Sequence, residues 1–126
     1  MKNKISPHVN IYRFPITAIS SISNRISGLI LTGAFIGTGT SCFFNLNLIE
    51  EYHKQSKINK KIINYLMIGS TSYHTLGGIR HIIWDRYPNL LNNKQVAQSS
   101  YYLFGSSLLI SYFFEKHYSK LDTNDY

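Results

Sequence analysis

The chain has 126 residues, a net charge of +7 and 15% charged residues, well below the ~25% typical of soluble globular domains. Its 44% hydrophobic and 14% aromatic content excludes intrinsic disorder. The single cysteine, Cys42, excludes a disulfide framework and a zinc site built from several thiolates. This length is room for one domain, residues 1–126.

Three segments of the chain contain no Asp, Glu, Lys or Arg. They are residues 26–49, 62–79 and 95–114. Each is close to the ~20 residues that a helix needs to cross the ~30 Å hydrocarbon core of a bilayer. The segments are also rich in Gly, Ser and Thr, which let membrane helices approach one another closely.

The pattern predicts an all-α membrane protein with three transmembrane helices. The predicted spans, after an N-terminal tail at 1–21, are 22–46, 62–84 and 96–114. A soluble bundle is the alternative, but 126 residues cannot surround three helices that are apolar on all sides. Seven basic residues fall on one side of the predicted membrane and six on the other, so charge does not set the orientation.

Two histidines of the second span, His74 and His81, are seven residues apart. On a helix they differ by about 20° and by about 10.5 Å along the axis, so they share a face but cannot ligate the same iron. One can ligate a haem, while the other, with Arg80, reaches the haem propionates. No other histidine lies within a span, so a second axial ligand would come from another chain. The alternative is that both histidines are polar helix contacts without a metal.

Arg25, at the start of the first span, shares a helix face with Ser21. A hydroxyl and a guanidinium beside an apolar pocket suit a quinone, and they equally suit a haem propionate. The alternative is an arginine that extends to the membrane interface without a ligand.

Two runs resemble the signatures of the large cytochrome b membrane-anchor subunits of succinate dehydrogenase, respiratory complex II. SPHVNIYRFPITAISSISNRISG (6–28) is similar to the family's S-P-H-x-x-I-Y followed by S-I-x-H-R-x-[ST]-G. SYHTLGGIRHIIWD (72–85) matches H-x-x-x-G-x-R-H-x-x-x-D residue for residue. The resemblance covers about residues 6–114.

The resemblance implies roles for particular positions. His74 stands at the axial ligand of haem b, whose second ligand comes from the small anchor subunit, so that the three helices form part of a heterodimeric anchor bundle. Ser21 and Arg25 stand at the ubiquinone site, and Arg80 and His81 stand near the haem propionates. Asn24 replaces the family's histidine, so neutralising the propionates falls on Arg25, Arg80 and His81.

The predicted function is that of a membrane anchor in a succinate:quinone oxidoreductase, which passes electrons from the iron–sulfur subunit to ubiquinone. The chain alone has no catalytic residue and no flavin or dicarboxylate site, so succinate oxidation belongs to the flavoprotein subunit. The alternatives are a non-redox scaffold or assembly subunit and the anchor of a fumarate-reducing relative. A nucleic-acid-binding protein is excluded because the basic residues form no single face.

The predicted location is the mitochondrial inner membrane, with several spans, and a bacterial plasma membrane is the alternative. Heavy use of Ile, Asn, Lys, Tyr and Phe is typical of an AT-rich genome. We expect neither a secretory signal nor an Arg-rich transit helix before the first span. Together these features favour a mitochondrially encoded chain.

Overall fold

The computed structural model describes residues 14–124, and within this range the chain forms helices and no strands. In chain order the elements are the helices α2 (Ile16–Phe43), α3 (Leu48–Lys54) and α4 (Lys57–Arg86), the 3-10 helix η1 (Pro88–Leu90), and α5 (Asn93–Asn124). The predicted all-α class is confirmed. Residues 1–13, which include most of the predicted tail and the start of the first signature, lie outside the described residues.

Local sequence chemistry explains where the long helices begin and end. Pro15 is the N-cap of α2, because its extended backbone (φ −72°, ψ 151°) and missing N–H suit a helix start. Helix α2 therefore begins at Ile16 rather than at 22, and it ends before Asn45, whose φ of 54° breaks the helix. Ser56 caps α4 by accepting a bond from Asn59 N at 3.3 Å. Pro88 stops the same helix, since the residue before proline disfavours helical geometry.

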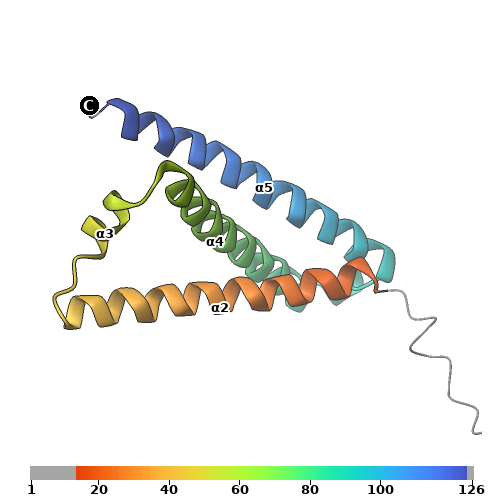
Figure 1. The fold of residues 1–126 in the computed structure, drawn as a ribbon. Helices are drawn as coiled ribbons and strands as arrows, with labels where there is room; N and C mark the ends of the chain where they lie inside the picture. The colour runs from red at the N-terminus through yellow and green to blue at the C-terminus, as the bar shows by residue number, and fades with distance from the viewer. Residues whose placement is uncertain (1–13, 125–126) are drawn as a thin grey trace, which may run out of the picture.

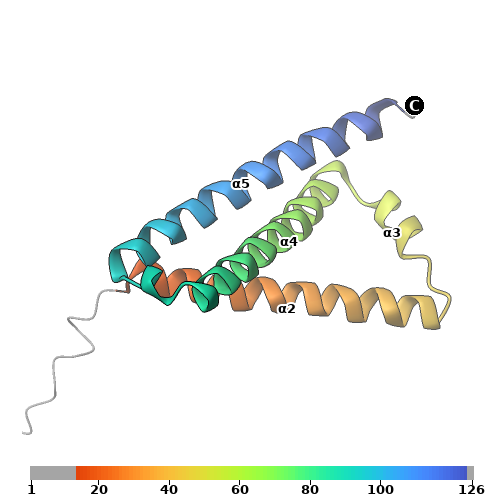
Figure 2. The same ribbon diagram turned by 180° about the vertical axis from the view of Figure 1, so that it is seen from behind.

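Helix α4 lies between α2 and α5 and contacts both (Figures 1 and 2). The N-terminus of α2, the C-terminus of α4 and the N-terminus of α5 meet at one end, which we call the closed end (Figure 1). Toward the opposite end α2 and α5 diverge, and α3 connects α2 to α4 there (Figure 2). The helices of 28, 30 and 32 residues are about 42, 45 and 48 Å long, which exceeds the ~30 Å hydrocarbon core.

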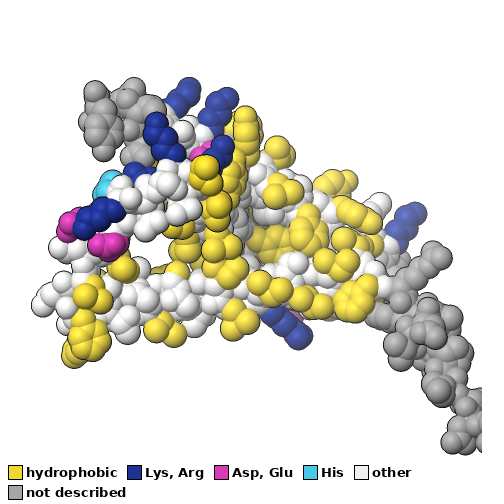
Figure 3. Space-filling view, viewed as in Figure 1, with side chains coloured by type: hydrophobic (Ala, Val, Ile, Leu, Met, Phe, Trp, Pro, Cys, Tyr) yellow, Lys and Arg dark blue, Asp and Glu magenta, His cyan; other side chains and the backbone are white. Residues whose placement is uncertain are grey.

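The packing between the helices uses small polar residues, while large apolar side chains face outward. Among the described side chains, the buried hydrophobic residues are Tyr73 and Leu103, and most buried polar residues are serines. Several of these serines, such as Ser107 and Ser111, donate to carbonyls of their own helix and so satisfy their hydroxyls locally. Figure 3 shows hydrophobic side chains exposed along the helices. This arrangement suits a lipid or protein environment around the bundle.

Among the described helices, α2 alone is long and apolar enough, by length and composition, to cross a membrane. Only 11% of the most apolar 18-residue stretch of α2 is buried within the described structure. The core helix of a soluble protein would be mostly buried. The prediction of three spans is therefore not confirmed by composition. The charge-free parts of α4 and α5 contain many Ser, Thr, Tyr and Gly residues, which lower their overall apolarity.

The short helix α3 is polar, as expected for a connection outside the predicted spans. Lys54 pairs with Glu50 at 2.9 Å and with Glu51 at 3.2 Å. These carboxylates raise the pKa of the Lys54 ammonium, since they favour its charged form. The residues between α2 and α4 thus form a surface segment with both signs of charge.

Candidate functional site

The imidazole of His74 on α4 lies against one turn of α2, and we call the residues around it the His74 cluster. His74 Nδ1 is 3.1 Å from the carbonyl oxygen of Asn24 and 3.3 Å from Ser27 Oγ. Ser27 Oγ in turn donates to the same Asn24 carbonyl at 2.8 Å. The fold therefore brings together Asn24, the position at which the first signature departs from the family, and His74, the predicted haem ligand of the second signature.

These contacts define the protonation of the ring. A carbonyl oxygen only accepts hydrogen bonds, so the proton of a neutral His74 belongs on Nδ1. Because Ser27 gives its own proton to the Asn24 carbonyl, its oxygen is also free to accept from Nδ1–H. The remaining ring nitrogen, Nε2, keeps a lone pair, and the side chain is exposed on the described chain. This is the tautomer that a metal-ligating histidine uses.

Two glycines allow the close approach of α2 and α4 at this point. A Cβ at Gly28 would lie 2.9 Å from His74 Cε1, so the ring occupies the space that a side chain would take. A Cβ at Gly77 would lie 2.9 Å from Asn24 Cγ. Asn24 Oδ1 is buried there without a hydrogen-bond partner among the described residues. The side chain of Asn24 thus packs against α4, while its backbone carbonyl holds His74.

Ser21 and Arg25 lie within the first ten residues of α2, the part nearer the closed end, and both are exposed. They are four residues apart, which is about 6 Å along the helix. Within the described part of the chain, Arg25 has no carboxylate partner. The two side chains are therefore available to a ligand that approaches α2 from outside the three helices.

Arg80 and His81 are not brought to the His74 cluster. Arg80 Nη1 donates to Ser100 Oγ on α5 at 3.1 Å, and its Cζ lies 4.6 Å from the centre of the Trp84 ring. His81 is exposed and lies edge-on to Trp84, with the ring centres 5.4 Å apart. Arg80 thus points to the other side of α4, and its predicted role near haem propionates stays a prediction.

A buried contact that sequence reasoning missed fixes the start of α2 against α4. Tyr73 OH donates to Ser20 Oγ at 3.1 Å and lies 3.2 Å from the Ser20 carbonyl oxygen. Ser20 is fully buried, and the Tyr73 ring packs on Phe104 of α5 at 5.0 Å. Because Ser20 and Tyr73 directly precede Ser21 and His74, this contact holds the two predicted ligand positions in register. The sequence offered one indication of this contact, since Tyr73 directly precedes His74 in the second predicted span.

The described residues contain no group of three or more His, Cys, Asp or Glu side chains that could hold a metal ion. A metal at this site would therefore take one ligand, His74, from the described part of the chain. A haem iron fits this donor set, since the macrocycle supplies four nitrogens and only the two axial positions remain. The free Nε2 and the carbonyl-bound Nδ1 of His74 match that requirement.

Comparison with known proteins gives a family match over most of the chain. Residues 1–114 match the family model described as "Succinate dehydrogenase/Fumarate reductase transmembrane subunit". The mitochondrial succinate dehydrogenase cytochrome b560 subunit of Dictyostelium discoideum is 29% identical over 113 residues, which are 86% of this chain and 59% of that protein.

Two further relatives are similar over comparable lengths. The succinate dehydrogenase cytochrome b560 subunit of Reclinomonas americana is 30% identical over 122 residues, 85% of this chain and 80% of that protein. The mitochondrial inner membrane protein SHH3 of Saccharomyces cerevisiae is 30% identical over 124 residues, 88% of this chain and 62% of that protein. The chain thus spans less than two thirds of the Dictyostelium and Saccharomyces proteins.

Proposed function

This chain belongs to the family of succinate dehydrogenase/fumarate reductase transmembrane subunits, and from that premise we propose that it binds haem b and ubiquinone in the membrane part of complex II. The predicted resemblance of the chain to the cytochrome b anchor subunits of succinate dehydrogenase is confirmed. Its predicted location in the mitochondrial inner membrane is confirmed as well. Electrons would arrive from an iron–sulfur subunit, and a flavoprotein subunit would oxidise succinate.

The placement we propose in the bilayer uses all three long helices, α2, α4 and α5, as spans of a single domain. Their lengths of about 42–48 Å exceed the hydrocarbon thickness, and large apolar side chains line their outer surfaces. The serines between them provide close helix contacts of the kind that membrane proteins use. The small anchor subunit would complete the bundle on the exposed side of His74.

The observation that carries the haem assignment is the contact of His74 Nδ1 with the Asn24 carbonyl, which leaves Nε2 for iron. The second axial ligand would be a histidine of the small anchor subunit. Bound haem would supply a one-electron reservoir. Asn24 and Ser27 would hold the His74 ring in one tautomer and orientation, while Arg25 and His81 would bind the propionates. Arg80 would join them only after turning away from Ser100.

The contact between Gly28 and His74 gives a test of this geometry. Gly28→Ala places a methyl group 2.9 Å from His74 Cε1, so the ring would have to shift from the position in which it would hold haem. Overpacking of this kind costs roughly 1–3 kcal/mol, so we expect haem to bind about 5- to 160-fold more weakly. The measurement is haem retained per purified complex during detergent washing.

Gly33→Ala is the matched control, because a Cβ at Gly33 meets nothing within 4 Å among the described residues. It should retain haem like the wild type. Equal retention by Gly28→Ala and Gly33→Ala would show that the haem ligand does not lie against α2 as described.

The proposed ubiquinone site uses the exposed pair at the closed end. Arg25 would donate to one quinone carbonyl and stabilise the negative charge that develops there on reduction. Ser21, one helical turn away, would donate a hydrogen bond to the same ring. Residues of the iron–sulfur and small anchor subunits would complete the pocket, since Ser21 and Arg25 are open to the outside of this chain.

Ser21→Ala tests quinone binding against a purely structural role. Loss of one hydrogen bond worth about 0.5–1.5 kcal/mol should lower kcat/KM for a short-chain ubiquinone roughly 2- to 12-fold. Reduction of a soluble dye that takes electrons from the peripheral subunits should stay unchanged. Ser23→Ala, on the same helix but outside the pair, should leave both rates unchanged. A non-redox scaffold predicts instead that both activities of Ser21→Ala fall together or that neither changes.

A further inference from the structure

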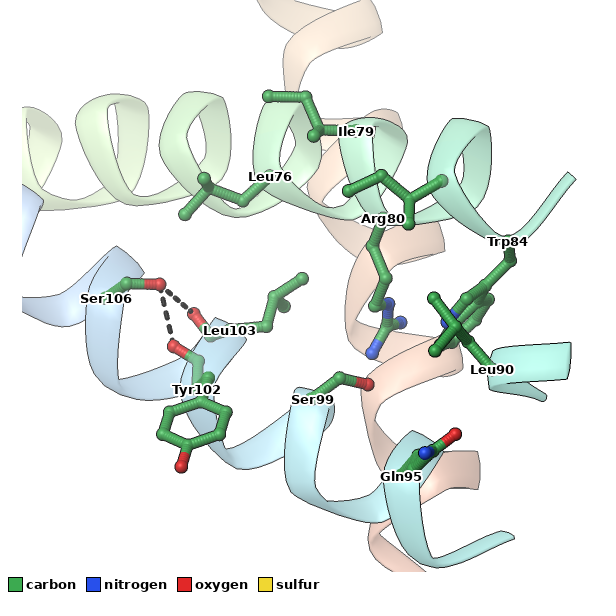
Figure 4. Close-up of a pocket in the computed structure, with 11 residues that line it drawn as sticks. Leu76, Ile79, Arg80, Trp84, Leu90, Gln95, Ser99, Tyr102, Leu103 and Ser106 are labelled. Carbon is green, nitrogen blue, oxygen red and sulfur yellow. Dashed lines mark hydrogen bonds between the residues drawn. The ribbon is translucent and has the colours of Figure 1, made fainter. Parts of the chain in front are cut away.

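A second feature of the chain lies on a different face of α4 from the His74 cluster. A cavity of about 440 Å³ opens between α4, η1 and the first turns of α5 (Figure 4). Arg80 lines it, six positions after His74, which is about 120° away around the helix. The cavity is therefore separate from the proposed haem and quinone sites. Its size lies within the range of about 300–1,000 Å³ that is usual for small-molecule pockets.

Most residues that line this cavity are apolar, and we call Arg80, Gln95 and Ser99 its polar part. Arg80, Gln95 and Ser99 lie toward the closed end, and Leu76 and Leu103 lie toward the middle of the bundle (Figure 4). Trp84 borders the polar part, and tryptophan is enriched at the headgroup level of membranes. If α4 and α5 span the bilayer, the polar part lies at headgroup depth and the apolar part lies at acyl-chain depth.

The polar part carries a positive charge without a counter-ion. A guanidinium has five N–H donors, and the hydrogen bond found for Arg80 within the described residues is the one from Nη1 to Ser100. Arg80 Nε is buried without a partner, and no described carboxylate pairs with this side chain. An anion would stabilise a positive charge that lies near the end of a membrane segment without an acidic partner. Phosphate suits this role, because a guanidinium binds it with paired hydrogen bonds.

We propose that this cavity binds one acidic phospholipid, with its phosphate at Arg80 and one acyl chain along Leu76 and Leu103. Ser99, whose hydroxyl donates to the Val96 carbonyl at 2.9 Å, lines the space for the phosphate. The cavity would hold the phosphate, the glycerol and the first part of that chain, while the rest of the lipid stays in the bilayer. Lipid binding here goes beyond haem and quinone binding, but it rests on the proposed spans of α4 and α5.

The test compares two arginines at the closed end. The purified complex is placed in nanodiscs of phosphatidylcholine with added phosphatidylglycerol, extracted gently, and its retained lipids are counted by native mass spectrometry. Wild type and Arg86→Gln, which changes an exposed arginine outside the cavity, should keep one phosphatidylglycerol. Arg80→Gln should lower this retention by about tenfold or more, since a hydrogen bond to a charged group contributes about 1.5–3 kcal/mol.

Ser99→Leu fills the polar part of the cavity without changing charge, and it should also lose the lipid. Retention of phosphatidylglycerol by both variants at the wild-type level would overturn the assignment. The lipid assignment would also be wrong if Arg80→Gln kept the lipid but shifted the haem potential, because Arg80 would then face a propionate.

Loss of the small anchor subunit from Ser99→Leu with the lipid retained would overturn the assignment too, because it would show that a helix of that subunit covers the cavity. An unchanged haem spectrum alongside lost lipid separates this site from the proposed haem site.

Discussion

Replacing His74 by alanine is expected to remove haem b from the purified complex. The described chain offers one imidazole at the contact of α2 and α4, with Nδ1 held by the Asn24 carbonyl at 3.1 Å and Nε2 left free. Without it, the described chain would have no imidazole at this contact to hold the haem. The haem-to-protein ratio should fall to background, and the b-type band should vanish from the dithionite-reduced minus oxidised spectrum.

His81→Ala is the informative comparison, because His81 shares the helix face of His74 but lies about 10.5 Å further along it. The complex should keep its haem in that variant, with a shifted midpoint potential if His81 neutralises a propionate. Haem lost from His81→Ala and kept in His74→Ala would reverse the ligand assignment. Haem kept in both would leave the two histidines as helix contacts.

Arg25→Ala is expected to lower kcat/KM for ubiquinone by about 100-fold or more, the usual effect of removing a donor that stabilises developing negative charge. Arg25 is exposed on α2 and has no carboxylate partner among the described residues, so its charge is available to a ligand. The rate is measured with succinate and a short-chain ubiquinone. Dye reduction by the peripheral subunits, measured in parallel, should not change.

Arg25→Lys separates charge from geometry, because lysine keeps the charge but loses the planar pair of donors. It should recover only part of the activity. Arg86→Ala, which removes another exposed arginine at the closed end, should behave like wild type. An Arg25→Ala complex that reduces ubiquinone at the wild-type rate would exclude Arg25 from the quinone site.

The sequence predicted the helices better than their ends. The three charge-free segments lie within or largely within α2, α4 and α5 because a membrane span must avoid charge. Helix α2 nevertheless begins at Ile16 and not at 22, since Pro15 rather than the charge pattern sets its start. The absence of charged residues indicates which segments can lie in lipid. Capping residues and proline determine at which residue a helix begins or ends.

The site residues stay predictions, and the structure adds contacts that the sequence did not show. His74, Ser21 and Arg25 followed from position and motif, but the main partner of His74 is a backbone carbonyl, which no residue type encodes. Arg80 was grouped with His81 because the two are adjacent in the chain. At 100° per residue it lies about 120° from His74, so helix periodicity already contained the signal that it faces α5.

The central claim is that His74 provides one of two imidazole ligands to a haem shared with another subunit. The most direct measurement is near-infrared magnetic circular dichroism of the oxidised wild-type complex, because the charge-transfer band of low-spin ferric haem identifies both axial ligands. We predict a low-spin haem with two imidazole ligands. A high-spin haem, a low-spin haem with another ligand pair, or a complex without haem would contradict the claim.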